Sequence, residues 1–226
     1  MQKNINSMKR FERKWVFDNS DYNQIYISLC RSKFGFIDHF PDRQVNSIYF
    51  DDQHYSSIVQ NVDGISDKKK YRLRWYGNFK NIINPVFEVK KKNGFEVSKD
   101  NFSLPNLNNL NLFKNDDIDF LASFINDNFN FTNKLFPILT THYLRSYFIS
   151  SNKLVRATID RNLKSLKLYQ SKNSDIIKEY NDIILELKYD LNLDNYVREN
   201  LGNTSVRLSK NSKFVNSATV TPDTLT

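Results

Sequence analysis

The chain has 226 residues, 39% of them hydrophobic and 26% charged, with a formal net charge of +8. This balance excludes a disordered chain and fits one domain with a sizeable core. No apolar run reaches the ~20 residues of a membrane-spanning helix, and the single Cys30 excludes an internal disulfide. The basic excess indicates an anionic partner: nucleic acid, a membrane surface or a phosphorylated compound.

Alternating, β-branched and aromatic stretches predict strands, and segments with apolar residues at helical spacing predict helices. In chain order these are a strand at 9–17, a helix at 18–33, a strand at 45–51, a helix at 53–61, strands at 68–77 and 85–93, a helix at 116–126, strands at 140–149, 154–163 and 182–190, and a helix at 193–201 before Gly202. The Asn-rich stretch 101–115 predicts a surface loop. The hairpin-like succession predicts an α+β fold, a mostly antiparallel sheet or barrel with helices packed outside.

The domain organisation follows from the scarcity of Gly and Pro, five residues each, which leaves no linker. We therefore expect a single domain over residues 1–218 and a disordered tail over 219–226. The polar start of the chain has no apolar stretch typical of a signal peptide, so we expect a cytoplasmic protein.

Charged residues recur on one face of five predicted strands, because side chains two residues apart share a face. They are Arg10, Glu12 and Lys14; Lys70, Arg72 and Arg74; Glu88, Lys90 and Lys92; Arg156 and Asp160; and Glu186 and Lys188. An ordinary sheet with a solvated polar face would also alternate. These faces, however, are mainly basic with about one carboxylate per strand, and the opposite faces are aromatic or aliphatic. The pattern favours a charged interior that binds a polyanion, with carboxylates that hold a divalent ion.

Eight short motifs lie in one order along nearly the whole chain. They are 10–15 (RFERKW), 47–51 (SIYFD), 70–77 (KYRLRWYG), 87–90 (FEVK), 143–145 (YLR), 155–160 (VRATID), 185–189 (LELKY) and 212–214 (SKF). In this order they resemble the VTC domain, the catalytic module of the vacuolar transporter chaperone complex, which belongs to the triphosphate tunnel metalloenzyme (CYTH) superfamily. The resemblance implies an eight-stranded antiparallel β-barrel, and a polyphosphate polymerase that uses ATP and Mn2+ or Mg2+.

The resemblance also implies roles for individual residues. Those expected to be catalytic are Lys14, Arg72, Arg74, Arg145, Arg156 and Glu186, and those expected to bind phosphate are Arg10, Lys70, Lys90, Lys188, Lys210 and Lys213. Glu186 would hold the metal, with Glu12 or Glu88 assisting, and Lys210 is an alternative match to Lys213. Arg10 stands where the superfamily pattern has a Glu, which leaves fewer metal ligands and favours synthesis over hydrolysis. A Gly expected soon after Phe214 is absent.

Two other functions stay open. A tunnel triphosphatase would use water as the acceptor and release orthophosphate. A binding module would hold polyphosphate or single-stranded nucleic acid without catalysis, but carboxylates on the basic faces disfavour nucleic acid, and Trp15 and Trp75 fall on the opposite faces. The expected partners are therefore ATP and polyphosphate, with any membrane association through a separately encoded membrane protein.

Overall fold

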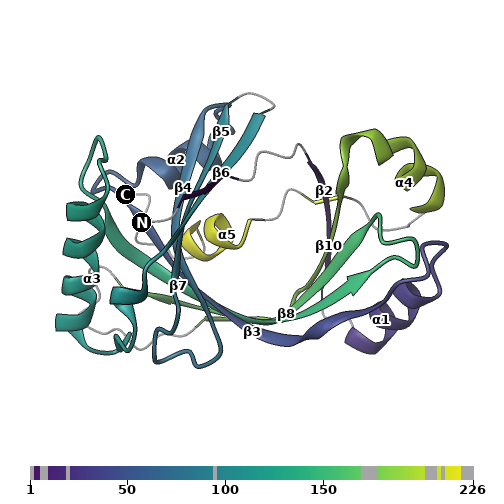
Figure 1. Cartoon of the computed structure of the whole chain (residues 1–226), viewed down its shortest axis with the longest axis horizontal. Coiled ribbons are helices and arrows are strands. Elements are labelled where there is room, and N and C mark those ends of the chain that lie inside the picture. The colour runs from purple at the N-terminus through teal and green to yellow at the C-terminus, as the bar shows by residue number, and fades with distance from the viewer. Residues whose placement is uncertain are drawn as a thin grey trace.

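A curled antiparallel sheet forms the centre of the computed structural model, which describes residues 3–5, 10–18, 21–93, 96–168, 178–201, 208–209 and 212–219 (Figure 1). The strands are β1 (Lys3–Ile5), β2 (Arg10–Phe17), β3 (Ile37–Asp51), β4 (Lys68–Tyr76), β5 (Val86–Asn93), β6 (Glu96–Ser103), β7 (Phe136–Ile149), β8 (Arg156–Lys167), β9 (Lys178–Tyr180) and β10 (Ile183–Asp190). Their order is β1-β6-β5-β4-β3-β7-β8-β10-β2, and β9 pairs with β8. Apart from the three-residue β1 and β9, eight long strands remain.

This architecture confirms the predicted eight-stranded antiparallel fold. Among the described residues β1 and β2 are the edges of the sheet and do not pair with each other, so the barrel is an open, strongly curled sheet. The helices are α1 (Tyr22–Cys30), α2 (Ser56–Val62), α3 (Asn115–Asn128), α4 (Asp194–Leu201) and α5 (Lys213–Thr219), with 3-10 turns at Pro105–Leu107 and Leu191–Leu193. No helix in the described part of the chain is long and apolar enough to cross a membrane.

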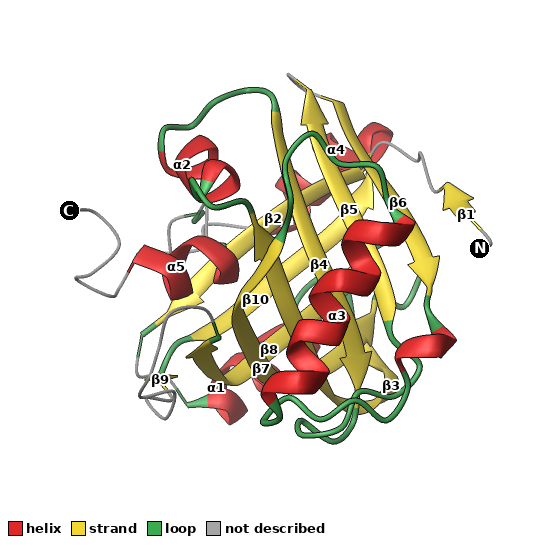
Figure 2. Ribbon diagram, turned by 90° about the vertical axis from the view of Figure 1, so that its left-hand side faces the viewer, coloured by secondary structure: helices red, strands yellow, loops and turns green. Residues whose placement is uncertain are grey.

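Two apolar clusters cover the outer, convex face of the sheet, as the alternation predicts. In the first, α1 and α4 pack on β2, β8 and β10 through residues that include Trp15, Leu29, Ile159, Leu187 and Val197. In the second, α3 packs on β3, β4 and β5 through residues that include Ile48, Leu73, Trp75, Phe87 and Leu121. Figure 2 shows α3 lying across the strands. Because these faces are buried under helices, the charged faces of the same strands lie on the concave side of the sheet.

The C-terminal helix α5 differs from the expectation that helices pack outside. It lies on the concave side of the sheet (Figure 1), where the ring of Phe214 stacks on Tyr49 with 4.8 Å between the ring centroids. Phe214 is 1% exposed. The alternation in the sequence did not predict this helix, which brings its own side chains into the concave face.

The predicted surface loop at 101–115 is wrong in its first part. β6 runs to Ser103, and Leu104, Leu107 and Leu112 are buried in the cluster under α3. Asn residues therefore occur within an element that contributes to the core. The strand predicted at 45–51 also begins earlier, at Ile37. The predicted tail lies outside the described residues from 220 onward, and α5 ends at Thr219.

Candidate functional site

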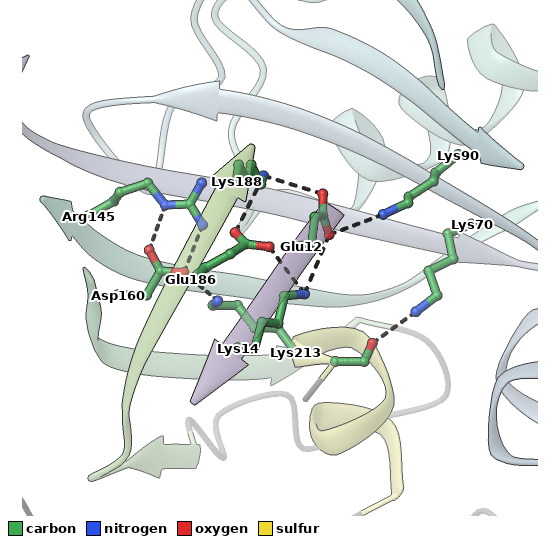
Figure 3. Close-up of polar contacts among 10 residues, drawn as sticks. Glu12, Lys14, Lys70, Lys90, Arg145, Asp160, Glu186, Lys188 and Lys213 are labelled. Carbon is green, nitrogen blue, oxygen red and sulfur yellow. Dashed lines mark hydrogen bonds and ion pairs between the residues drawn. The ribbon is translucent and has the colours of Figure 1, made fainter. Parts of the chain in front are cut away.

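The concave face of the sheet gathers the charged side chains that the alternation placed together. Figure 3 shows side chains from β2, β5, β7, β8, β10 and α5 pointing toward one another. The cations on the concave face are Lys14, Lys70, Arg72, Arg74, Lys90, Lys99, Arg145, Lys188 and Lys213. The carboxylates on this face are Glu12, Glu88, Asp160 and Glu186. Cations outnumber carboxylates, and the carboxylates divide them into three groups.

The first group lies on β2 and β10, which both carry the pattern Glu-x-Lys. The strands are antiparallel, and the register places Lys14 opposite Glu186 and Glu12 opposite Lys188. Each carboxylate therefore lies between lysines. Lys14 Nζ and Lys188 Nζ each lie 3.4 Å from a Glu186 oxygen, and Lys188 Nζ lies 3.5 Å from Glu12.

Both carboxylates of this group are ionised. Burial would raise the pKa of Glu186, but Lys188 and Lys14 lower it well below its usual value. Burial likewise opposes ionisation of Glu12, and its pKa is lowered by Lys188 and Lys90. Burial also works against the charge of Lys14, yet Glu186 and Glu12 raise its pKa. In this group negatively charged carboxylates therefore alternate with positively charged lysines.

The second group surrounds Glu88 on β5. One carboxylate oxygen accepts from Arg72 on β4, and the other accepts from Lys99 on β6 and lies 3.6 Å from Arg74. Burial would raise the pKa of Glu88, but Arg72, Arg74 and Lys99 hold it far below its usual range. Both oxygens of Glu88 thus accept hydrogen bonds from cations, whereas the lysines around Glu12 and Glu186 lie 3.4–3.9 Å from the carboxylate oxygens.

The third group joins β7, β8 and α5. Arg145 donates from Nε and from Nη2 to the two oxygens of Asp160 at 2.5 and 2.7 Å, a forked pair. Lys213 of α5 also donates to Asp160. Asp160 is 1% exposed; burial would raise its pKa, but Arg145 and Lys213 lower the pKa to about 2. The sequence placed Asp160 on the charged face without giving it a role, and here it fixes two predicted phosphate-binding residues.

Positive charge is left over within this face. Lys70 donates to the Ser212 hydroxyl at 2.9 Å. Burial, together with Lys90 and Lys14, lowers the pKa of Lys70 to about 7. Burial, then Arg72, lowers the pKa of Lys99 to about 8 in spite of Glu88. Burial and neighbouring cations both disfavour the charged form of these two lysines. A bound polyanion would relieve the repulsion between the cations.

Several buried polar atoms on the same face also lack partners in the described part of the chain. They include the Nε of Arg74 and the hydroxyls of Ser47, Thr141 and Thr158. Ser47 lies opposite both Arg74 and Thr141 in the register, and Thr158 lies opposite Glu186. Buried donors are normally satisfied, so a water or ligand oxygen that reaches these atoms would supply the partner that they lack.

The remaining predicted site residues lie at the margins. Arg10 is at the start of β2, 3.8 Å from Asp190. Arg156 is exposed at the start of β8, opposite Lys188 in the register, and its side chain makes no hydrogen bond or ion pair with another described residue. Lys210 lies outside the described residues. The structure brings the other predicted cations together.

Lys99 is the site residue that sequence reasoning missed, because the strand β6 was not predicted. A signal was present: Asn93-Gly94 is a strong two-residue hairpin signal, and it follows a predicted strand. A hairpin at this point makes 96–103 the next strand, and the register then places Lys99 opposite Lys90.

A divalent metal fits this face only with ligands from a bound anion. Among the described residues no three His, Cys, Asp or Glu side chains come together to hold an ion. Glu12 and Glu186 lie on adjacent strands and share Lys14 and Lys188. Mg2+ is commonly bound by one or two carboxylates together with phosphate oxygens, and this pair fits that arrangement. Glu88, whose two oxygens both accept hydrogen bonds from cations, fits it poorly.

Comparison with known proteins gives one family match. The model of the family described as the VTC domain matches residues 9–221. No curated protein matches the sequence.

Solved structures similar to this chain come from bacteria and a plant. A Vibrio parahaemolyticus protein named as an adenylate cyclase shares 12% identity, with 87% of this chain and 86% of that chain covered and a TM-score of 0.46. A Hippeastrum protein named as an adenylyl cyclase, for which a dominant triphosphatase activity is described, shares 12% identity over 94% of this chain and 98% of that chain, with a TM-score of 0.49. A Bacillus halodurans protein named as an adenylate cyclase shares 14% identity over 91% and 96%, with a TM-score of 0.48.

Proposed function

The chain belongs to the VTC domain family, and on this premise we propose that it transfers the γ-phosphate of ATP to the end of a polyphosphate chain held on the concave face of its sheet. The observation that carries the proposal is the excess of cations over carboxylates on that face, including lysines whose pKa is lowered by burial and by other cations. A chain of phosphates supplies the charge that this face lacks.

The reaction needs little covalent chemistry from the protein. An oxygen of the terminal phosphate of the chain attacks the γ-phosphorus of ATP, a new P–O bond forms, and the bond to the β–γ bridging oxygen breaks to release ADP. The attacking oxygen is already anionic, so no general base is required. Alignment and neutralisation of charge are the remaining tasks.

Arginines on two strands are suited to these tasks. Arg72 and Arg74 are held by Glu88, and Arg145 is held by Asp160, so their guanidinium groups are ordered before a ligand binds. Preorganised donors of this kind lose little entropy when they bind phosphate oxygens. Lys14, Lys90 and Lys188 lie around Glu12 and would bind the acceptor chain.

The metal would be held by Glu12 and Glu186. A divalent ion held there would supply positive charge to neutralise the phosphate oxygens. The two carboxylates keep their charge, since their lysine neighbours lower both pKa values. Because Arg10 stands where the superfamily pattern has a Glu, Glu12 and Glu186 have no third carboxylate beside them at that position of β2.

The test is a single incubation of the full chain with ATP and Mn2+, with products separated by size. A ladder of phosphate polymers together with ADP is expected. Orthophosphate and ADP without a polymer would overturn the proposal in favour of hydrolysis on the same face, and binding of polyphosphate with no turnover would favour a binding module.

A variant pair ties the activity to this face. Glu186→Gln should lower the rate of polymer formation by about two orders of magnitude, the scale seen when one charge-stabilising group is removed. Glu179→Gln is the matched control, because Glu179, on the far strand β9, is an exposed carboxylate paired with Lys164 of β8. Equal rates in wild type and Glu186→Gln would exclude Glu186 as a metal ligand.

A further inference from the structure

An arginine surrounded by three aromatic rings lies at one end of the concave face. The Cζ of Arg43 is 5.4 Å from the ring centroid of Phe40 and 5.7 Å from those of Tyr76 and Tyr147. The Phe40 and Tyr76 residues are 46% and 44% exposed. We call these four residues, Phe40, Arg43, Tyr76 and Tyr147, the aromatic rim.

On β4 and β7, a residue of the rim lies two positions after an arginine of the basic face. Tyr76 follows Arg74 by two residues on β4, and Tyr147 follows Arg145 by two residues on β7. Residues two apart on a strand share a face and lie roughly 7 Å from each other. This spacing is similar to the distance between the first phosphate of a nucleotide and its base. A triphosphate on the two arginines would therefore direct its nucleoside toward the tyrosines.

The charge of the rim favours an anionic ligand. Arg43 lies directly opposite Arg145 in the register of β3 and β7. Like charges in opposite positions repel. Arg145 is compensated by Asp160, whereas Arg43 forms no ion pair with a carboxylate in the described part of the chain. A phosphate between the two arginines would compensate the second charge.

The rings and the guanidinium provide planar surfaces. Exposed aromatic rings and arginine planes bind bases by stacking, largely independently of base identity. Burial raises the pKa of Tyr147 to about 12, so its ring stays neutral and does not repel an anion. Phe40 and Tyr147 meet edge to face at 6.0 Å, and the exposed surface for contact with a base is on Phe40 and Tyr76.

The backbone of β3 is irregular where it presents Phe40. The register with β7 shifts between Asp38 and Phe40 and again between Phe40 and Arg43. Bulges redirect side chains and are enriched beside active sites. Regular pairing would have placed Phe40 and Arg43 on opposite faces, because they are three positions apart; the shifts bring both to one cluster.

We infer that the aromatic rim binds the nucleobase of the nucleoside triphosphate whose phosphates lie on Arg74 and Arg145. The inference rests on the proposed function only in taking a nucleoside triphosphate as the ligand. It assigns a recognition role to Arg43, Tyr76, Tyr147 and Phe40, none of which was expected from the sequence to be a site residue. The rim would distinguish a nucleotide donor from an inorganic polyphosphate chain, because polyphosphate has no base to stack.

Binding measurements on the full chain test this directly, without turnover. The probes are inorganic triphosphate and 2-aminopurine riboside triphosphate, whose fluorescence falls when the base stacks. Wild type should quench the fluorescence and bind the nucleotide about tenfold more tightly than Tyr76→Ala or Arg43→Ala do. Tyr76→Ala should bind inorganic triphosphate as wild type does, which also shows that it is folded, whereas Arg43→Ala, which removes a cation, should weaken binding of inorganic triphosphate less than binding of the nucleotide.

Two further variants sharpen the result. Tyr76→Phe retains the ring and should retain quenching, and Phe120→Ala removes an exposed ring from the distant helix α3 and should change nothing. Nucleotide binding without quenching, or an equal loss of affinity for both probes in Tyr76→Ala, would overturn the inference. If quenching and its loss are seen but ATP yields only orthophosphate, the rim assignment stands and the polymerase proposal fails.

Discussion

Glu12 on β2 and Lys90 on β5 form an ion pair of 3.7 Å, although β4, β3, β7, β8 and β10 lie between their strands in the sheet. The sheet therefore curls until side chains from its two halves meet across the concave face (Figure 3). Glu12 also lies within 4 Å of Lys14 and Lys188. One carboxylate thus holds lysines from three strands near one point.

Replacing this carboxylate should separate its two roles. Glu12→Gln removes a negative charge that repels a polyanion, so binding of inorganic triphosphate in the presence of a chelator should tighten by about fivefold. Polymer formation with Mn2+ should fall, because a metal ligand is lost. Titration calorimetry and the product ladder measure the two effects.

Glu179→Gln, on the far strand β9, is the control and should change neither quantity. Weaker binding of inorganic triphosphate to Glu12→Gln without metal would contradict this account. It would show that Glu12 acts mainly by positioning the lysines around it.

Ligand binding should take up protons through Lys70. Its pKa is about 7 in the free protein, against an ordinary 10.5, owing to burial and the neighbouring lysines. A bound polyanion favours the charged form, so between these two values binding recharges the amine, and affinity falls as pH rises. Calorimetry at pH 8 in buffers of different ionisation enthalpy should show about one proton taken up, shared between Lys70 and Lys99.

Lys70→Met should reduce this uptake and flatten the decline of affinity with pH. Lys92→Met is a suitable control, since Lys92 is exposed near the end of β5. An uptake that is the same in Lys70→Met and wild type would assign the proton to another group.

Asp160→Asn should destabilise the fold at neutral pH by about 3 kcal/mol, because Arg145 and Lys213 lose their buried partner. The folded pKa of Asp160, about 2, lies below the ordinary 3.8. Its contribution is therefore fully present above the ordinary value and is lost as pH falls through the folded one. Urea unfolding should show a gap between wild type and variant that narrows from about pH 5 to about pH 2.

Inorganic triphosphate should recover part of this loss, since it can pair with the freed cations. Asp127→Asn, an exposed position on α3, should match wild type at every pH. A gap that stays constant with pH would indicate that the substitution acts through packing.

Phe214→Ala should release α5 from the concave face. The stacked contact with Tyr49 buries Phe214 completely, and its truncation should lower the free energy of unfolding by about 3 kcal/mol. Amide exchange should accelerate in α5 more than in β4, and affinity for inorganic triphosphate should drop because Lys213 leaves Asp160. Phe214→Leu should recover part of both effects. Unchanged affinity would remove Lys213 from the binding site.

The sequence predicted the strands that alternate well and the faces that they present. Glu12 and Lys14, or Arg72 and Arg74, could be assigned to one side because the period of two holds along β2 and β4. The pairing of Glu186 with Lys14 could not be predicted from the alternation, since register depends on which strands meet. It follows from the β2–β10 pairing, which joins distant parts of the chain.

The parts that the sequence did not predict have local causes. β6 contains Asn101 and charged residues, and its strand propensity is weak until the hairpin with β5 supplies the partner. α5 is seven residues long and forms against Tyr49, so tertiary contact outweighs its local preference. The aromatic rim depends on two register shifts in β3 that break the alternation on which the prediction relied.

The pairing of Lys14 with Glu186 also sets when the site can form during synthesis. Residues 14 and 186 belong to adjacent strands, and translation proceeds at about 5–20 residues per second. For about ten seconds or more after β2 leaves the ribosome, its charged edge has no partner strand, and Arg145 and Asp160 emerge before Lys213 can join them. Non-local pairing of this kind slows folding. An abundant cellular polyanion would therefore bind the basic strands before their partner strands are synthesised.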